Sequence, residues 1–420
     1  MLIVVQPLSA GVRLAARAVR AGIPCLIPTQ FPELLPPEVT AGATVVDWHP
    51  ELGVPGLLRR VEESGARPTG VVAGFEYVVP ESAELARTLG LPALGAEAAE
   101  AVRQKDVMRR RCAERDIAFP RSVPVAPESA GPCPLPFPVV VKPVDCGGSL
   151  MVSLCRDAEE YERALAAVHR PGEVKFHPSP RRVALVEEYV EGPEFSLDGW
   201  VDGAGPHVAS VTTKFLSDPP DFFETGHIAT APAHSPHGAL LEEFARRVVE
   251  AFDLTVGPFH IETRIDRGGR PVLIEVGARL AGDCIPELVL AGPGVDLCAA
   301  AVDAARGVRH EPGPLSPVSA GLAFVTTDRP GPFAGTLSGA EPFLRAEEFR
   351  GLVPEAEPGT VLDPADIFSN RVARLHFEGD LDRVERLVAS VLTEVEVDIA
   401  AAGATGTQRP VLKEKEGVRA

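Results

Sequence analysis

The chain has 420 residues, of which 45% are hydrophobic and 24% are charged, and these are the proportions of an ordinary globular protein. Its formal net charge of −18 argues against nucleic acid and against an anionic membrane surface as partners, because both require a basic face. No apolar run approaches the roughly 20 residues of a membrane-spanning helix, and the first residues carry no signal-peptide pattern. Seven scattered cysteines without a Cys-x-x-Cys pair predict reduced thiols and a cytoplasmic protein.

The first 95 residues alternate between predicted strands and predicted helices. We expect strands at 2–6, 24–28, 44–48 and 71–74, and helices at 11–21, 54–64 and 82–89. This alternation predicts a Rossmann-like parallel sheet with helices on both faces. No Gly-x-Gly-x-x-Gly follows the first strand, so a dinucleotide-binding enzyme is not favoured. Glu76 follows the last of these strands, at the edge where such sheets bind ligands, although plain solvent exposure is the alternative.

A lysine within a valine-rich strand is the first candidate for chemistry. A helix is expected over 96–115, the proline-rich stretch 124–138 is expected to be a loop, and Lys142 then follows three valines. Such a lysine must reach an anion or extend to the surface, because an unpaired buried ammonium is expensive. The next turn contains Gly147, Gly148 and Ser149, and glycines let backbone N–H groups approach phosphate oxygens. An ordinary hairpin turn is the alternative reading.

Acidic residues surround the next predicted strand, after a helix at 159–168. Glu187 and Glu188 end this strand, and Glu194 begins the one that follows. The linker between them, which contains Val190, could offer backbone groups to an adenine edge, and Glu194 could accept from ribose hydroxyls. Without further context these glutamates would be surface charges.

A hairpin over residues 260–279 follows a helix expected at 240–252. A turn at Asp266–Gly269 places Glu262 opposite Glu275, and like charges so opposed are destabilising unless they are compensated. Two such carboxylates suit a hard divalent cation, most often Mg²⁺ with substrate phosphates. His260, opposite Gly277, either orders this pair or is simply hydrogen-bonded.

The end of the chain gives a weaker pattern. Strands at 320–326 and 372–377 and a helix within 380–394 predict a small α+β C-terminal domain over 307–402. The polar segment 403–420 is expected to be disordered.

The order of these features resembles the ATP-grasp superfamily. The resemblance covers roughly residues 95–300 and implies an ATP-grasp fold over 96–306, with a nucleotide lid at about 120–190. The segments 222–227 and 274–282 are similar to carboxylate–amine ligases of the L-amino-acid ligase type, and segments 4–11 and 72–76 extend that likeness. One departure is Gly277, which stands where many members have the asparagine of Glu-x-Asn, so water or the nucleotide would have to complete a second metal shell.

The resemblance implies that ATP phosphorylates a carboxylate, and that an amine then displaces phosphate to give an amide and ADP. ATP would be held by Lys105, Lys142, Gly147, Gly148, Ser149, Glu187, Glu188, Val190 and Glu194. Glu262 and Glu275 would hold Mg²⁺, in two ions that Mn²⁺ could replace. The catalytic groups would be Arg279, Lys142 and His227, and the substrates would meet Glu76, Glu224, His227, Arg279 and Gly282.

The implied partners are a small-molecule carboxylate and a small-molecule amine, with a homodimer and a carrier protein left open. Two other functions compete with the amide ligase. One keeps the fold but uses bicarbonate or a carrier-protein acceptor. The other is a nucleotide-binding protein without turnover, which the opposed Glu262 and Glu275 argue against, because a sensor needs no metal carboxylates.

Overall fold

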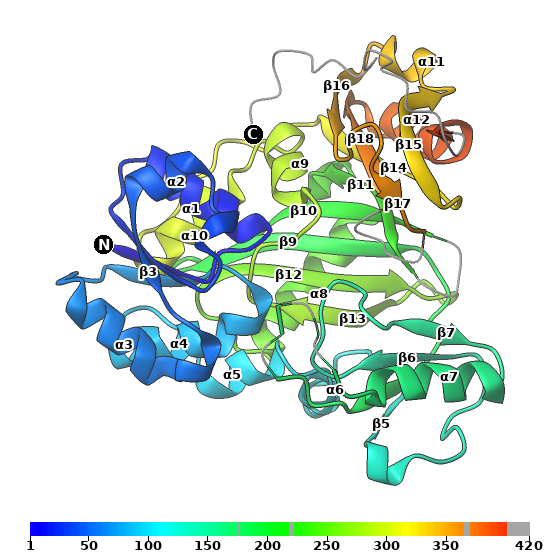
Figure 1. Cartoon of the computed structure of the whole chain (residues 1–420). Helices are drawn as coiled ribbons and strands as arrows, with labels where there is room; N and C mark the ends of the chain where they lie inside the picture. Colours follow the sequence, from blue (N-terminus) through cyan, green and yellow to red (C-terminus); the bar gives the residue numbers. More distant parts are fainter. Residues whose placement is uncertain (173, 175, 178, 218–221, 365–369, 401–420) are drawn as a thin grey trace.

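The computed structural model describes residues 1–172, 174, 176–177, 179–217, 222–364 and 370–400 (Figure 1). The segment predicted to be a disordered tail, 403–420, lies outside these residues. Among the described residues, no helix has the length and apolar content to cross a bilayer. The strands form sheets of four, eight, three and four strands.

The N-terminal sheet confirms the predicted parallel α/β arrangement. Its order is β3-β2-β1-β4, with all neighbours parallel. Alternate residues of β1 enter different cores, since Leu2 and Val4 belong to one apolar cluster and Ile3 and Val5 to another. A strand buried on both faces must be apolar throughout, as this one is. The elements are β1 (Leu2–Val5), α1 (Ala10–Arg20), β2 (Cys25–Thr29), α2 (Pro37–Gly42), β3 (Ala43–Asp47), α3 (Gly53–Glu63), β4 (Gly70–Ala73) and α4 (Val79–Thr88).

The single helix expected over 96–115 is wrong, because the structure has α5 (Ala96–Ala101) and α6 (Lys105–Glu114). Gln104 has an extended backbone, and the Lys105 N–H donates to the Val144 carbonyl at 2.7 Å. Residues 96–115 are good helix formers, so local propensity gives no sign of the break. The long-range hydrogen bond compensates for it and sets Lys105 at the start of α6.

The lid expected at 120–190 corresponds to an antiparallel sheet in the order β5-β8-β6-β7, covered by α7 (Ala158–His169). Its strands are β5 (Ser122–Val125), β6 (Val139–Pro143), β7 (Ser153–Cys155) and β8 (Ala184–Glu188). The loop predicted over 124–138 therefore begins within a strand. Pro124 is tolerated there because β5 is an edge strand, where a missing N–H costs no ladder hydrogen bond.

The largest sheet has eight strands in the order β13-β12-β9-β10-β11-β14-β18-β16, and β9, β10, β12 and β13 run side by side in Figure 1. Helix α8 (Gly238–Ala251) packs against β9, β10 and β13. The strands are β9 (Glu194–Asp202), β10 (Gly205–Leu216), β11 (Glu224–Thr230), β12 (Gly257–Ile265), β13 (Pro271–Gly277), β14 (Ser319–Thr326), β16 (Phe349–Pro354) and β18 (Arg371–Gly379). Two further helices, α9 (Ile285–Ala291) and α10 (Leu297–Ala305), follow the hairpin.

The C-terminal segment expected as an α+β unit shares this large sheet, because β14, β16 and β18 continue it. The segment adds a small sheet in the order β17-β15-β19 and a helix, α12, that packs on β11, β14 and β18. The remaining elements are β15 (Gly331–Ser338), α11 (Glu341–Leu344), β17 (Val361–Leu362), α12 (Leu381–Glu394) and β19 (Glu396–Ile399). Short 3-10 helices lie at Pro32–Leu34, Pro50–Leu52, Glu76–Val78, Pro127–Ser129 and Pro232–His234.

The hairpin of β12 and β13 pairs Glu262 with Glu275 and His260 with Gly277, as predicted. The register near the turn differs, because Thr263 pairs with Leu273 and one residue of β13 is left unpaired as a bulge. Gly269 has a φ of +76°, and its N–H donates to the Asp266 carbonyl. The loop is therefore one residue longer than a two-residue turn, and the bulge restores the predicted pairing of the glutamates.

Candidate active site

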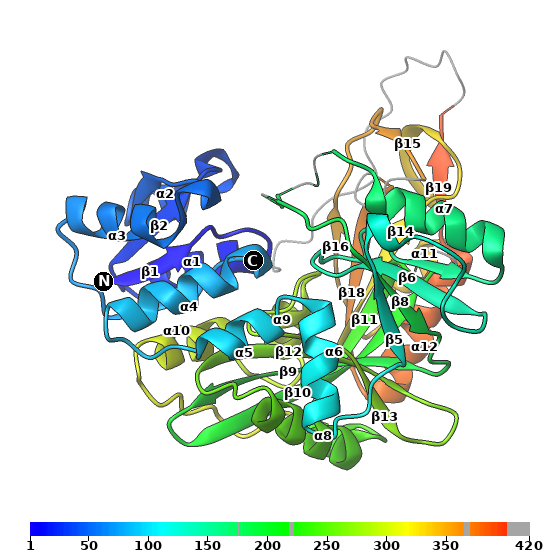
Figure 2. The ribbon, with the colours of Figure 1, turned by 90° about the horizontal axis from the view of Figure 1, so that it is seen from below.

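A cavity of about 610 Å³ lies where the N-terminal unit, the lid and the large sheet meet, and the lid sheet faces the large sheet in Figure 2. All but one of the predicted site residues line it. Those that do are Glu76, Lys105, Lys142, Gly147, Gly148, Ser149, Glu187, Glu188, Val190, Glu194, Glu224, Glu262, Glu275, Arg279 and Gly282. The exception is His227.

The two predicted phosphate lysines are buried and already paired. Lys105 Nζ lies 2.9 Å from Glu275 Oε1 and donates to the Cys146 carbonyl at 2.7 Å. Lys142 Nζ lies 2.6 Å from Glu187 Oε2. Burial lowers the pKa of Lys142, although the Glu187 charge opposes this. Lys142 thus reaches an anion, as its position in an apolar strand requires, and it still lines the cavity.

Glu187 links the lid to helix α6. Arg109 Nε lies 2.6 Å from Glu187 Oε1, so both carboxylate oxygens are engaged. Burial works against ionisation, but the charges of Arg109 and Lys142 keep the pKa of Glu187 below its usual value. Arg109 also donates to the Ile274 carbonyl at 2.6 Å, which ties β13 to the same group. Arg109 was not predicted as a site residue. The one sequence feature that points to it is its position about one helical turn after Lys105.

An aromatic wall lies beside the linker after β8. The rings of Tyr189 and Phe222 stack with centroids 5.9 Å apart, and the Arg264 guanidinium lies over both. Arg264 also donates to the Val190 carbonyl at 2.9 Å and to Glu194 Oε2 at 2.8 Å. Such a wall suits a flat ring, since stacked aromatics prefer offset contact.

Glu188 differs from the other linker residues. Its side chain pairs with Arg121 at 2.7 Å, and its backbone N–H donates to the Arg121 carbonyl. Further along, the Tyr189 N–H donates to the Pro138 carbonyl and the Val190 carbonyl accepts from Arg264, so an adenine edge would have to meet the Val190 N–H.

Lys214 neutralises three acids contributed by three strands. Its Nζ lies 2.7 Å from Glu262 Oε1, 2.8 Å from Glu224 Oε1 and 3.1 Å from Glu194 Oε1. Burial opposes the charge, but the three carboxylates raise the pKa of Lys214 well above its usual value and Lys214 lowers that of Glu262. With Lys105 on Glu275, each opposed carboxylate of the hairpin has its own lysine, which compensates the repulsion.

His260 is held in a charged state next to these glutamates. Its Nδ1 lies 2.8 Å from Asp198 Oδ1 and its Nε2 3.2 Å from Glu262 Oε1. Burial alone would lower the pKa of His260, but the Asp198 carboxylate raises it to about 9. The protonated ring therefore donates to both acids at neutral pH. Asp198 was missed, because its partner lies on a neighbouring strand.

This pairing predicts how stability depends on pH. The folded pKa of His260, about 9, exceeds its ordinary value of 6.5, so the stabilisation is complete below pH 6.5 and is lost as pH rises through 9. A shift of this size corresponds to at most about 3 kcal/mol. Thermal unfolding of the wild type and of Asp198→Asn from about pH 6 to 10 should show a gap in Tm that narrows towards pH 10. A gap independent of pH would contradict the assignment.

Arg279 and Glu76 form an ion pair across the cavity. Arg279 Nε lies 2.5 Å from Glu76 Oε2, and Glu76 is 5% exposed, so the solvent-exposed alternative for Glu76 is wrong. Burial opposes ionisation, yet the charge of Arg279 lowers the pKa of Glu76 to about 2. A Cβ at Gly277 would lie 3.5 Å from Arg279 Cγ. The glycine therefore borders the Arg279 side chain.

The glycine turn after β6 is held from the N-terminal unit. The Gly147 N–H donates to the Tyr77 hydroxyl at 3.3 Å, and the Arg103 guanidinium lies over the Tyr77 ring. Gly148 has a φ of +68°, and a Cβ there would meet nothing within 4 Å, so this part of the turn is open.

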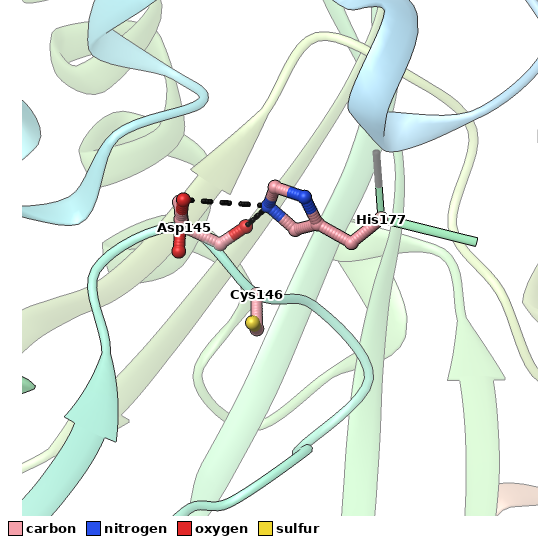
Figure 3. Close-up of side chains that lie close together, drawn as sticks. All are labelled: Asp145, Cys146 and His177. Atoms are coloured by element: carbon pink, nitrogen blue, oxygen red, sulfur yellow. Dashed lines mark hydrogen bonds and ion pairs between the residues drawn. The ribbon is translucent and has the colours of Figure 1, made fainter. Parts of the chain in front are cut away.

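Asp145 and Cys146, directly before the glycine turn, form a cluster with His177 (Figure 3). His177 Nε2 lies 3.3 Å from Asp145 Oδ2 and 3.0 Å from the Asp145 carbonyl. The Arg103 guanidinium is 3.0 Å from the same nitrogen. These contacts connect the start of the turn to His177 and Arg103.

The structure differs from the prediction that His227 contacts substrate. His227 is fully buried within β11, next to Phe324 of the neighbouring β14, and does not line the cavity. Its Nε2 lies 3.0 Å from Glu224 Oε2. Neither ring nitrogen makes a hydrogen bond within the described part of the chain, and of the two residues only Glu224 lines the cavity.

This chain is similar to known proteins in sequence. Residues 135–287 match the family described as ATP-grasp domain. Uncharacterized protein y4rH of Sinorhizobium fredii is 30% identical over 235 residues, 54% of this chain and 47% of that protein. Dapdiamide A synthase of Enterobacter agglomerans is 29% identical over 156 residues, 36% of this chain and 35% of that protein. The chain thus spans half or less of the length of these curated relatives.

The fold is also similar to a solved structure over almost its whole length. The crystal structure of L-amino acid ligase from Bacillus licheniformis superposes with a TM-score of 0.75 and 22% identity, covering 95% of this chain and 98% of that one. The predicted ATP-grasp fold, with its preceding parallel-sheet unit, is therefore confirmed.

Proposed function

We propose that this chain, which carries an ATP-grasp domain over residues 135–287, is an ATP-dependent carboxylate–amine ligase. It would form an amide between two small molecules through an acylphosphate, and release ADP and phosphate. The observation that carries the proposal is that Lys105, Lys142, Arg279 and the opposed Glu262 and Glu275 converge on one cavity. Similarity to dapdiamide A synthase and to the fold of an L-amino acid ligase supports the same class of reaction.

ATP would lie between the lid and the large sheet. Its phosphates would meet Lys105, Lys142 and the open glycine turn, whose backbone N–H groups can approach an anion closely. Its ring would lie against the Tyr189 and Phe222 wall, near the backbone at Val190. Glu194, already fixed by Arg264 and Lys214, would accept from the ribose. Phosphoryl transfer needs little covalent work from a protein, so this positioning and neutralisation would supply most of the catalysis.

The donor set on the hairpin fits a hard divalent cation. Glu262 and Glu275 offer carboxylate oxygens that lie opposite each other and line the cavity, as Mg²⁺ bound with phosphates requires. When bound, Mg²⁺ would neutralise phosphate charge during transfer, and Mn²⁺ could take its place. Gly277 offers no ligand, so water or the nucleotide would complete a second shell.

The substrate side of the cavity holds one arginine among acids. Arg279 would hold the carboxylate and stabilise the acylphosphate, because its partly buried guanidinium keeps its charge at all relevant pH values. Glu76 holds this guanidinium in place by its ion pair with Arg279 Nε. Glu224 and Gly282 also line this side, where an amine would attack the acyl carbon and phosphate would leave. The partners are thus a small-molecule carboxylate and a small-molecule amine.

The nucleotide product tests the proposal. With ATP, Mg²⁺ and a matrix of paired amino acids, we expect amide formation with ADP and phosphate in equal amounts, because an acylphosphate route cleaves the γ-phosphate. Phosphate release and mass spectrometry of the products would measure both. AMP with pyrophosphate would mean adenylation and would overturn the mechanism. Turnover with bicarbonate as the only carboxylate would indicate carboxylation instead.

A further inference from the structure

The loop that joins β13 to α9 has a backbone that needs support. Asp283 and Cys284 are consecutive and have φ values of +46° and +65°, in the left-handed region that disfavours residues with a Cβ. Such residues persist only where their surroundings hold them. The same loop carries Arg279 and Gly282, which line the cavity. Whatever holds the loop therefore also sets the position of Arg279.

Arg371 holds this loop at Asp283, and Arg13 NH2 lies 3.7 Å from the Cys284 sulfur next to it. Arg371 begins β18 and grips Asp283 with both terminal nitrogens, NH1 to Oδ1 at 2.9 Å and NH2 to Oδ2 at 3.2 Å. NH2 also donates to the Glu224 carbonyl at 2.9 Å, and the guanidinium lies 3.7 Å over the Phe324 ring. A bidentate arginine–carboxylate pair fixes direction as well as distance. The loop is thereby tied to the start of β11.

A metal ion does not explain the same residues. The donor atoms of Glu224, His227 and Asp283 lie within 4.8 Å of one another. Both oxygens of Asp283 are engaged by Arg371, however, and those of Glu224 face Lys214 and His227. Both oxygens of each carboxylate are thus engaged, whereas the lysine and histidine contacts of Glu262 and Glu275 are all to Oε1. We call the paired contacts of Arg371 with Asp283 and with the Glu224 carbonyl the clamp.

We propose that Arg371 is a positioning residue, which holds the loop 279–284 against the Glu224 end of β11. It thereby completes the side of the cavity where Arg279 would meet the substrates. Strand β18 lies beyond residue 287, where the match to the ATP-grasp family ends, so this part of the site belongs to the C-terminal segment. The effect on amide formation rests on the proposed function. The contact between Arg371 and the loop does not rest on that function, because it concerns only the backbone conformation of residues 279–284.

The test compares Arg371→Met with Arg374→Met. Arg374 lies on the same strand, pairs with Glu355 away from the cavity, and is a matched control for loss of an arginine from β18. Without any substrate, amide hydrogen exchange in residues 279–285 should become at least about tenfold faster in Arg371→Met and stay unchanged in Arg374→Met. Equal exchange in the wild type and Arg371→Met would overturn the clamp.

Kinetics and a rescue test separate positioning from general destabilisation. We expect kcat/KM for the carboxylate and the amine to fall by about 10² in Arg371→Met, since a shift of about 1 Å has this effect, while ATP affinity stays within about twofold. Adding Cys284→Gly should restore part of the loss, because glycine accepts a positive φ without support. Parallel losses of ATP affinity and Tm without rescue would show a merely structural role. If the wild type forms no amide with any pair, the proposed function fails, while hydrogen exchange still decides the clamp.

Discussion

Replacing Arg279 by methionine is expected to lower kcat/KM for amide formation by about 10²–10³. Arg279 would face the charge that develops on the acylphosphate, and loss of one such preorganised donor typically has an effect of this size. Methionine keeps an unbranched stem but leaves Glu76 buried without its partner. Steady-state kinetics at saturating ATP would measure the loss. Nucleotide affinity, measured by titration with a non-hydrolysable ATP analogue, should change little.

Two further variants make the result specific. Arg279→Met/Glu76→Gln removes both charges of the pair, so a thermal melt should recover stability without recovering activity. Arg267→Met, at the exposed turn of the same hairpin, is the control and should behave as the wild type. Near-normal turnover in Arg279→Met would contradict the assignment of Arg279 as the residue that binds the substrate carboxylate.

Replacing Glu275 by glutamine is expected to abolish metal-dependent turnover, with a loss of at least about 10³, because an amide is a far weaker ligand for Mg²⁺ than a carboxylate. Added Mg²⁺ and ATP should raise the Tm of the wild type by mass action, and raise that of the variant much less. Since Lys105 is paired with Glu275, the variant should also lose some stability before any ligand is added.

Exposed Glu159, which pairs with Arg163 on the outer face of α7, provides the control for this charge loss. Glu159→Gln should keep full activity and the full increase in Tm with Mg²⁺ and ATP. Full activity in Glu275→Gln would remove the metal assignment from the hairpin.

The sequence predicted the features that depend on local patterns. The parallel strands were visible as short apolar runs between helices, and the Glu262–Glu275 pairing followed from a turn of Asp and Gly residues. The bulge in β13 was not predictable, because a longer loop and an extra residue cancel in the final register. The break before Lys105 was also hidden, since its cause is a hydrogen bond to Val144 in another unit.

Most of the candidate site residues were named from local patterns together with the resemblance to the ATP-grasp superfamily, but their partners were not. Lys214 was not among the predicted site residues, and only the strand order shows that it reaches three acids from β9, β11 and β12. Asp198 and Arg109 likewise act on residues far along the chain. Nothing near Arg371 in the sequence indicated that it meets Asp283, 88 residues earlier. Sequence patterns therefore identify the residues that line the cavity better than the residues that hold them in place through long-range contacts.

Helix α10 has a consequence for how the molecule melts. It packs on α1 and β4 of the N-terminal unit and on β9 and β12 of the large sheet, and one apolar core contains Leu14, Trp200, Ala300 and Leu322. Two sheets that share a core lose their packing together, so heat should unfold them in one cooperative transition. The lid has its own core around Val139, Tyr161 and Val186, so we expect it to open locally at a lower free energy than the shared core, once its contact from Arg109 to Glu187 is broken.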